Sequence, residues 1–164
     1  NTTAEDIINL GVDGVMLSNG PGDPAENEDI IKNLKDILNM RIPVFGICLR
    51  HQLLARANGF STEKLKYGHR GANQPVKDLK TGQAYISSQN HGYAVVSSSI
   101  DKNIADEYFV NVNDGTNEGI EYKIYPAFSV QFHPEACSGP LDTQPLFDKF
   151  YDMIEANRKH KKTI

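Results

Sequence analysis

The chain has 164 residues, 39% of them hydrophobic and 23% charged, which suits one globular domain with its own core. The formal net charge of -4 argues against a nucleic-acid partner, and no apolar run approaches the ~20 residues that span a membrane. Two cysteines, Cys48 and Cys137, do not make a disulfide framework. We therefore expect a reduced, cytoplasmic setting.

The first third of the chain alternates helical and strand patterns. Thr3 with Asp6 three positions later is typical of a helix start. Apolar spacing predicts amphipathic helices between short apolar runs, which we interpret as buried strands. The expected helices are 3–10, 26–40 and 49–57, and the expected strands are 14–18 and 43–48. This order implies parallel strands with helices on the faces of the sheet.

Shorter alternating runs follow, and the chain closes on a helical pattern around Phe147–Ile154. The expected strands, some of them antiparallel, are 75–79, 84–88, 93–97, 106–112, 118–122 and 127–132. Together the elements predict a single α/β domain over residues 1–164. We expect a three-layer, open, mostly parallel sheet with helices on both faces.

Cys48 ends an apolar run and precedes the helix that begins at Leu49. The segment 46–50 has the order of a nucleophile elbow, in which a tight turn lifts a reactive side chain above the sheet edge. The helix N-terminus behind the sulfur would favour a thiolate. A buried structural cysteine explains this residue equally well when it is taken alone.

His133 and Glu135 follow the apolar run 127–132, and strand alternation puts both on one side of the chain. A carboxylate beside an imidazole fixes its tautomer and stabilises its charged form. A nucleophilic cysteine needs such a base near it in space. The alternative for this pair alone is a chance His-x-Glu at a strand end.

A third feature is the loop Asn19-Gly20-Pro21-Gly22-Asp23-Pro24, which follows the expected strand 14–18. Its glycines would let backbone N–H groups approach a substrate closely, as an oxyanion site requires, although a plain turn is also possible. The loop lies at the carboxyl edge of the sheet, where open α/β sheets place their sites. Three weak signals thus converge on one edge.

The sequence resembles class I glutamine amidotransferases over nearly its whole length. The segments that carry this resemblance are 17–24, 43–49 and 132–135, in the family's order and spacing. Three more segments narrow the resemblance to the small subunit of carbamoyl-phosphate synthetases: 68–76, 88–95 and 113–120. The resemblance implies a flavodoxin-like fold.

The resemblance also implies a reaction. Cys48 attacks the side-chain amide of glutamine, His133 shuttles protons and Glu135 orients the imidazole. The remaining implied site residues hold the oxyanion or bind glutamine, and they are Gly20, Gly22, Leu49, Gln52, Asn90, Gly92 and Tyr93. Ammonia then passes to a large synthetase subunit, which uses ATP and Mg, so no cofactor or metal is expected in this chain.

Two departures from the family stand out. The family's N-terminal domain and the first strand of its amidotransferase domain are not in this sequence, so we expect a fragment with an open sheet edge. Arg50 occupies a glycine position of the family's elbow. A catalytically impaired regulatory or binding subunit therefore remains open as an alternative, as does a cysteine hydrolase or isomerase on a similar elbow.

Overall fold

The structure is a computed structural model that describes residues 2–18, 27–134 and 144–162. Its helices are α1 (Ala4–Leu10), α2 (Glu28–Asn39), α3 (Leu49–Ala57) and α4 (Gln144–Lys162). Its strands are β1 (Val15–Leu17), β2 (Val44–Ile47), β3 (Thr62–Asp78), β4 (Ala84–Val95), β5 (Ala105–Asn111), β6 (Asn117–Tyr122) and β7 (Ala127–Val130). The strands form one sheet in the order β1-β2-β7-β6-β5-β3-β4.

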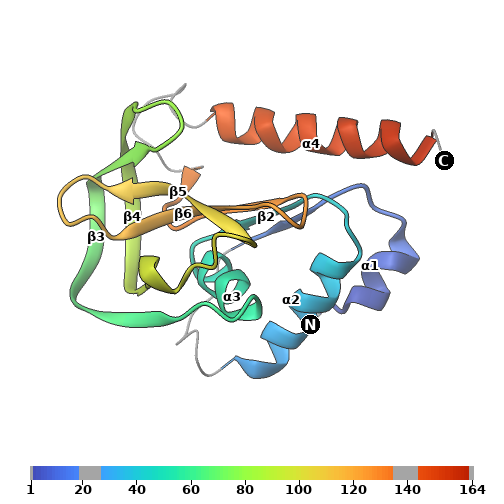
Figure 1. Cartoon of the computed structure of the whole chain (residues 1–164), viewed down its shortest axis with the longest axis horizontal. Helices are drawn as coiled ribbons and strands as arrows, with labels where there is room; N and C mark the ends of the chain where they lie inside the picture. The colour runs from blue at the N-terminus through green and yellow to red at the C-terminus, as the bar shows by residue number, and fades with distance from the viewer. Residues whose placement is uncertain (1, 19–26, 135–143, 163–164) are drawn as a thin grey trace.

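The expected three-layer arrangement is confirmed. Figure 1 shows α4 above the sheet and α1, α2 and α3 below it. Strand alternation divides the core accordingly. Val44 packs in the cluster with α1–α3, whereas its neighbour Phe45 packs in the cluster with α4. On the α4 side, the Phe45 ring stacks on Phe128 of β7, with centroids 4.4 Å apart. Since each cluster covers one face, both faces of the sheet are covered at β2.

The sheet is mixed, which corrects the expectation of a mostly parallel one. Only β1–β2 and β2–β7 pair in parallel among the described strands, and the four pairings from β7 to β4 are antiparallel. The physical reason is connection length. A parallel pair needs a long crossover, as α2 provides between β1 and β2, whereas short turns join β3 to β4 and β5 to β6.

Two strands extend beyond the predicted bounds. β3 begins at Thr62 rather than at residue 75, and β4 joins the separately predicted runs 84–88 and 93–97. Gly68 and Gly71 have positive φ angles of 70° and 112°, close to shifts in the β3–β4 register. Such bulges break the alternation of side chains on which a sequence-based strand assignment depends.

The predicted start of α1 is confirmed in detail. The Thr3 hydroxyl accepts a hydrogen bond from the Asp6 N–H at 3.1 Å, and the Asp6 carboxylate accepts from the Thr3 N–H at 2.9 Å. This reciprocal capping box satisfies two N–H groups that the helix leaves without partners. Gly11 ends the helix in the left-handed conformation, with φ 64°.

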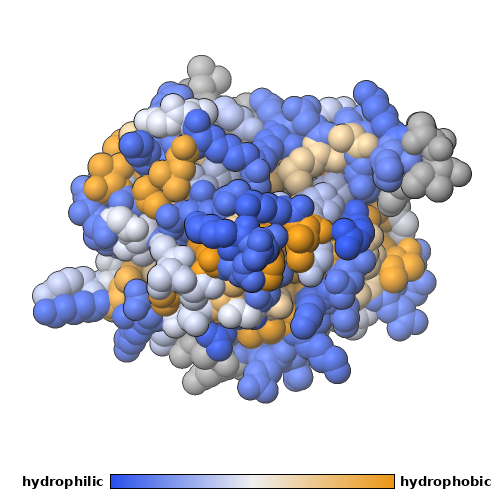
Figure 2. All heavy atoms as spheres, in the orientation of Figure 1, coloured by the Kyte–Doolittle hydropathy of each residue, from blue (hydrophilic) through white to orange (hydrophobic). Residues whose placement is uncertain are grey.

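Strand β1 lies at one end of the described sheet and pairs only with β2 there. Four large apolar side chains near this edge are more than a third exposed: Ile8, Leu10, Val12 and Met16. Figure 2 shows apolar surface at the end of the molecule where α1 lies. The expected open edge is therefore present in the described part of the sheet, and exposed apolar side chains lie near it. None of the described helices is long and apolar enough to cross a membrane.

Candidate active site

Cys48 occupies a strained turn between β2 and α3. Its backbone angles, φ 56° and ψ -113°, lie outside the regions that non-glycine residues favour, and its side chain is 3% exposed. The turn brings α3 close to β2. The distance shows this, since a Cβ added to Gly46 would lie only 2.5 Å from Leu54 Cδ1. The predicted strand–turn–helix context is thus confirmed, and the sulfur lies at the N-terminus of α3.

Parallel pairing brings the region of His133 to the same sheet edge. Ile47 of β2 is paired with Val130 of β7, and the Cys48 N–H extends this pairing by donating to the Val130 carbonyl at 2.9 Å. His133 follows β7 by three positions, and its N–H donates to the Ser88 carbonyl of β4 at 2.9 Å. Cys48 and His133 thus follow neighbouring strands at their carboxyl ends, as the sequence predicts.

Three buried or half-buried groups connect α3, β4 and the segment after β7. Gln52 Nε2 lies 2.8 Å from the Tyr93 carbonyl oxygen and 2.7 Å from Gln131 Oε1. Gln131 Nε2 in turn lies 3.8 Å from Cys48 Sγ. The structure therefore brings Gln52 and Tyr93, both predicted from the sequence, into one polar network with the thiol. Gln131 is a site residue that the sequence reasoning did not single out.

The other predicted binding residues that the structure describes belong to β4 and α3. Asn90 and Gly92 are on β4, where Asn90 is exposed and Gly92 is half-buried. Leu49 is the first residue of α3, and the N–H at that position has no acceptor within its own helix. Gly20, Gly22 and Glu135 lie outside the described residues, as does Cys137.

Arg50 is the second residue of α3 and has an ordinary helical backbone, since it is absent from the described residues with positive φ. The replacement of glycine therefore brings no left-handed strain at this position. The half-buried side chain extends toward the end of β1, where Nε donates to the Ser18 carbonyl at 3.4 Å. The partner of Nε is thus a main-chain carbonyl.

His51, next to Arg50, is a structural group. It is fully buried, and its Nδ1 lies 2.7 Å from the Ser129 hydroxyl oxygen on β7. Burial, with a smaller contribution from the charge of His91, lowers the pKa of His51 to about 3. The ring is therefore neutral near pH 7 and ties α3 to β7 by a neutral hydrogen bond.

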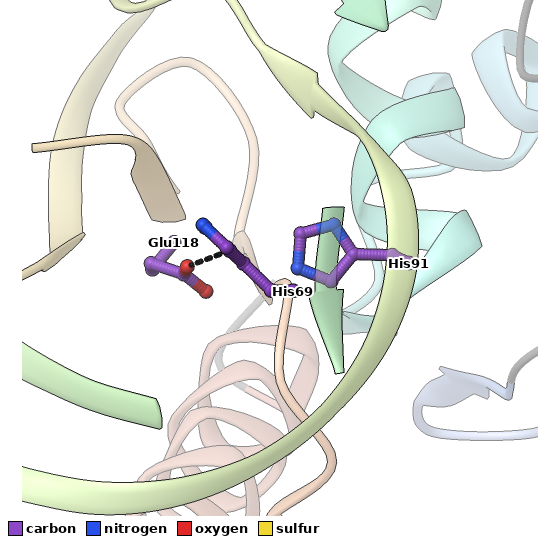
Figure 3. A group of neighbouring side chains, drawn as sticks. All are labelled: His69, His91 and Glu118. Atoms are coloured by element: carbon purple, nitrogen blue, oxygen red, sulfur yellow. Dashed lines mark ion pairs between the residues drawn. The ribbon is translucent and has the colours of Figure 1, made fainter. Parts of the chain in front are cut away.

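A second cluster of ionisable residues is built from β3, β4 and β6, which carry His69, His91 and Glu118. His69 Nε2 lies 2.7 Å from an Asp114 oxygen, and its Nδ1 lies 3.1 Å from a Glu118 oxygen. Figure 3 shows the His69 ring between Glu118 and the ring of His91, whose centroid is 5.0 Å away. The pKa of His69 is raised to about 9, chiefly by Glu118 and against the effect of burial.

His69, His91 and Glu118 are residue types that bind metals, and their ligand atoms lie within 4.8 Å of one another. Both ring nitrogens of His69 face carboxylates, however, which is the arrangement of an imidazolium in an ion pair. Metal coordination would need a ring nitrogen without its proton. The cluster was missed from the sequence, where its only signal was the position of all three residues in segments shared with the family.

Comparisons with known proteins agree with this geometry. The profile of the family described as Glutamine amidotransferase class-I matches residues 1–153. Among similar proteins, the carbamoyl phosphate synthase small chain of Bacillus cereus is 55% identical over 159 residues, which cover 97% of this chain and 43% of that protein. The pyrimidine-specific small chain of Bacillus subtilis is 51% identical over 164 residues, which cover 100% of this chain and 44% of that protein.

Solved structures support the fold alone, because their sequence identity to this chain is low. A Thermoplasma acidophilum protein assigned to GMP synthase has a TM-score of 0.76 and 22% identity, with coverage of 93% of this chain and 77% of that one. A glutamine amidotransferase of Thermotoga maritima has a TM-score of 0.65 at 22% identity, with coverage of 94% and 74%. This chain spans less than half the length of the small chains that it resembles. On the profile match and the elbow at Cys48, the chain belongs to the class I glutamine amidotransferase family.

Proposed function

We propose that this chain hydrolyses the side-chain amide of glutamine and is the glutamine-hydrolysing part of a carbamoyl-phosphate synthase. The observation that carries the proposal is Cys48 in a positive-φ conformation at the N-terminus of α3. Strain of this kind persists at functional sites because the surrounding fold enforces it. A helix N-terminus also favours the thiolate, which is the reactive form of the thiol.

In the proposed reaction, the Cys48 thiolate attacks the amide carbon of glutamine. The C–N bond breaks as His133 donates a proton to the leaving nitrogen, and ammonia and a γ-glutamyl thioester form. His133 then takes a proton from water, whose oxygen attacks the thioester carbon; the C–S bond breaks, glutamate leaves, and the Cys48 thiolate and protonated His133 are restored. Glu135 orients the imidazole, and the N–H groups of Leu49 and Gly20 hold the oxyanion.

Glutamine would bind along β4 and the start of α3. Asn90, Gly92 and Tyr93 supply polar groups from β4, and Gly22 lies beside them in the family pattern. Gln52 requires a more specific role than the sequence suggested. Its Nε2 already faces the Tyr93 carbonyl and Gln131. We therefore propose that Gln52 Oε1, the other end of this side-chain amide, accepts a hydrogen bond from the substrate glutamine.

The partner in this proposal is a large synthetase subunit that receives the ammonia and uses ATP and Mg to make carbamoyl phosphate. Support comes from the relatives, which are named as small chains of carbamoyl phosphate synthase and share 51% or more of their residues with this chain over the matched region. We propose a cytoplasmic location, because a catalytic thiolate has to remain reduced.

An impaired subunit is not favoured by the position of Arg50. The residue is helical and its Nε contacts Ser18, so the elbow geometry at Cys48 forms in its presence. The decisive measurement is glutaminase activity of the whole small chain with its large subunit present. We expect hydrolysis in the parent protein and its loss in Cys48→Ser, with circular dichroism unchanged.

Two results would contradict the proposal. An inactive parent protein that binds glutamine and the large subunit would indicate the regulatory alternative. Hydrolysis by Cys48→Ser close to the parent rate would remove Cys48 from the mechanism, because a serine hydroxyl is a far weaker nucleophile in a site adapted to a thiolate.

A further inference from the structure

The side chain of Gln131 is fully buried and lies against the sulfur of Cys48. Its Nε2 is 3.8 Å from Sγ, and the two residues are 0% and 3% exposed. Backbone hydrogen bonds of 2.9 Å hold both residues in place, from Cys48 N–H to the Val130 carbonyl and from Gln131 N–H to the Glu118 carbonyl. The backbones that carry the amide and the sulfur are therefore anchored at the sheet edge.

The direction of the Gln131 amide follows from the chemistry of its neighbours. The carbonyl oxygen of Tyr93 can only accept hydrogen bonds, so the Gln52 atom that lies 2.8 Å from it must be the amide nitrogen. The same nitrogen lies 2.7 Å from the Gln131 side chain, which must present its oxygen there. The nitrogen of Gln131 is then the end that faces Sγ. A main-chain carbonyl thus orients two amides in turn and directs an N–H donor at the thiol.

We propose that Gln131 is a further catalytic residue, whose amide N–H stabilises Cys48 as a thiolate, and that Gln52 is the positioning residue that fixes this donor. The inference rests on the proposed function of Cys48 as the nucleophile. A hydrogen bond to sulfur favours the charged form over the neutral thiol. The N-terminus of α3 acts in the same direction. Unlike an imidazole, an amide does not titrate, so this donor stays in place at every pH at which the protein is folded.

The test measures the rate of Cys48 alkylation by iodoacetamide as a function of pH, in a Cys137→Ala background of the full small chain. Gln131→Met, which keeps the approximate shape but removes the donor, should raise the midpoint of the profile by about one pH unit. Gln131→Glu keeps an oxygen for Gln52 and places a carboxylate near the sulfur, so its midpoint should rise further. Gln52→Met should produce a smaller rise. Gln89→Met is the matched control, at a buried glutamine whose amide donates to the Ser87 hydroxyl.

A residue with only a structural role would lower the melting temperature and leave the alkylation midpoint where it was. An unchanged midpoint in folded Gln131→Met or Gln131→Glu would therefore overturn the inference. A second readout comes from the glutaminase assay, in which kcat should fall about tenfold in Gln131→Met with a smaller change in KM.

The failure of this inference is distinct from the failure of the proposed function. If the parent protein does not hydrolyse glutamine but the midpoint moves in the Gln131 variants, the proposed function fails and the donor to sulfur stands. If the parent protein is active and the midpoint does not move, the proposed function stands and Gln131 has no role in activating the thiol.

Discussion

Arg50 Nε lies 3.4 Å from the carbonyl oxygen of Ser18, so the arginine connects the first turn of α3 to the residue that follows β1. The family has a glycine at this position of its elbow. In this chain the backbone at residue 50 is helical. Any effect of Arg50 on activity must therefore come from the position of its long side chain. We expect this side chain to lie beside the entrance of the glutamine site, so glutamine binding is the property that it should affect.

Arg50→Gly should lower KM for glutamine and leave kcat unchanged, because we expect the arginine side chain to obstruct substrate and transition state alike. It should also cost about 1 kcal/mol of stability, since glycine is a poor helix former. Arg50→Ala is the matched control, with the same fall in KM and little loss of stability. A large rise in kcat would contradict this expectation and indicate that arginine disturbs the thiolate or the oxyanion donors.

Cys48→Gly should be more stable than Cys48→Ala by about 1 kcal/mol. A non-glycine residue at φ 56° and ψ -113° carries strain of about 1–3 kcal/mol, and glycine relieves it. At an ordinary helical position the glycine variant is less stable than the alanine variant. Ala55→Gly in the buried interior of α3 is therefore an informative control and should be destabilising. Urea unfolding of the three variants measures the differences. Equal stability of the two Cys48 variants would show that the turn is not strained.

Gly46→Ala should lower the free energy of unfolding by about 1–3 kcal/mol, because the new methyl group meets Leu54 Cδ1 at 2.5 Å. Leu54→Ala alone leaves a cavity, but it also removes the clash. The double variant should therefore be less destabilised than the sum of the single variants. Leu38→Ala, on α2, serves as the comparison, and its combination with Gly46→Ala should be additive. Additivity in both pairs would show that α3 can move away from β2 freely.

The three buried histidines should give a stability maximum near pH 6.5. His69 has a folded pKa raised to about 9, so its stabilising contribution is complete below 6.5 and is lost as the pH rises through about 9. His51 and His91 have folded pKa values lowered to about 3 and 4, chiefly by burial. Their contributions are complete above 6.5 and are lost as the pH falls toward those values.

Urea unfolding across this pH range measures the profile. The double variant His69→Gln/Glu118→Gln replaces the ion pair by neutral groups, and it should flatten the alkaline side of the stability profile. The single variant His69→Gln leaves a buried carboxylate without its cation, so it should be strongly destabilised. An alkaline decline that persists in the double variant would mean that groups other than His69 cause it.

The positions of Cys48 and His133 could be predicted from the sequence because they depend on robust features. Both follow short apolar strands, and parallel strands bring their carboxyl ends to one edge. Gln131 was not predicted, although it lies two residues before His133. A polar residue directly after an apolar strand is usually solvated, and only the packing of α3 and β4 shows that its amide is enclosed beside the thiol.

The course of β3 could not be predicted for a different reason. Its middle contains Gly68 and Gly71, and its burial pattern does not alternate regularly, so no period-2 signal marks it as a strand. Pairing with β4 determines its conformation instead, through a register that shifts twice. The antiparallel half of the sheet depends on such long pairings, which local sequence patterns report poorly.

Gln131 and Cys48 are separated by 83 positions along the chain, and strands β3 to β6 all lie between the two strands that these residues follow. During synthesis, the elbow therefore leaves the ribosome long before the strand that covers it. Contacts of such high sequence separation form late in folding, because closing a long loop has an entropic cost. Until β7 docks between β2 and β6, the sulfur has neither its amide donor nor its cover. On the proposed role of Gln131, the thiol therefore gains its N–H donor only when the second half of the chain has folded, and a chain truncated before β7 would carry the cysteine without its surroundings.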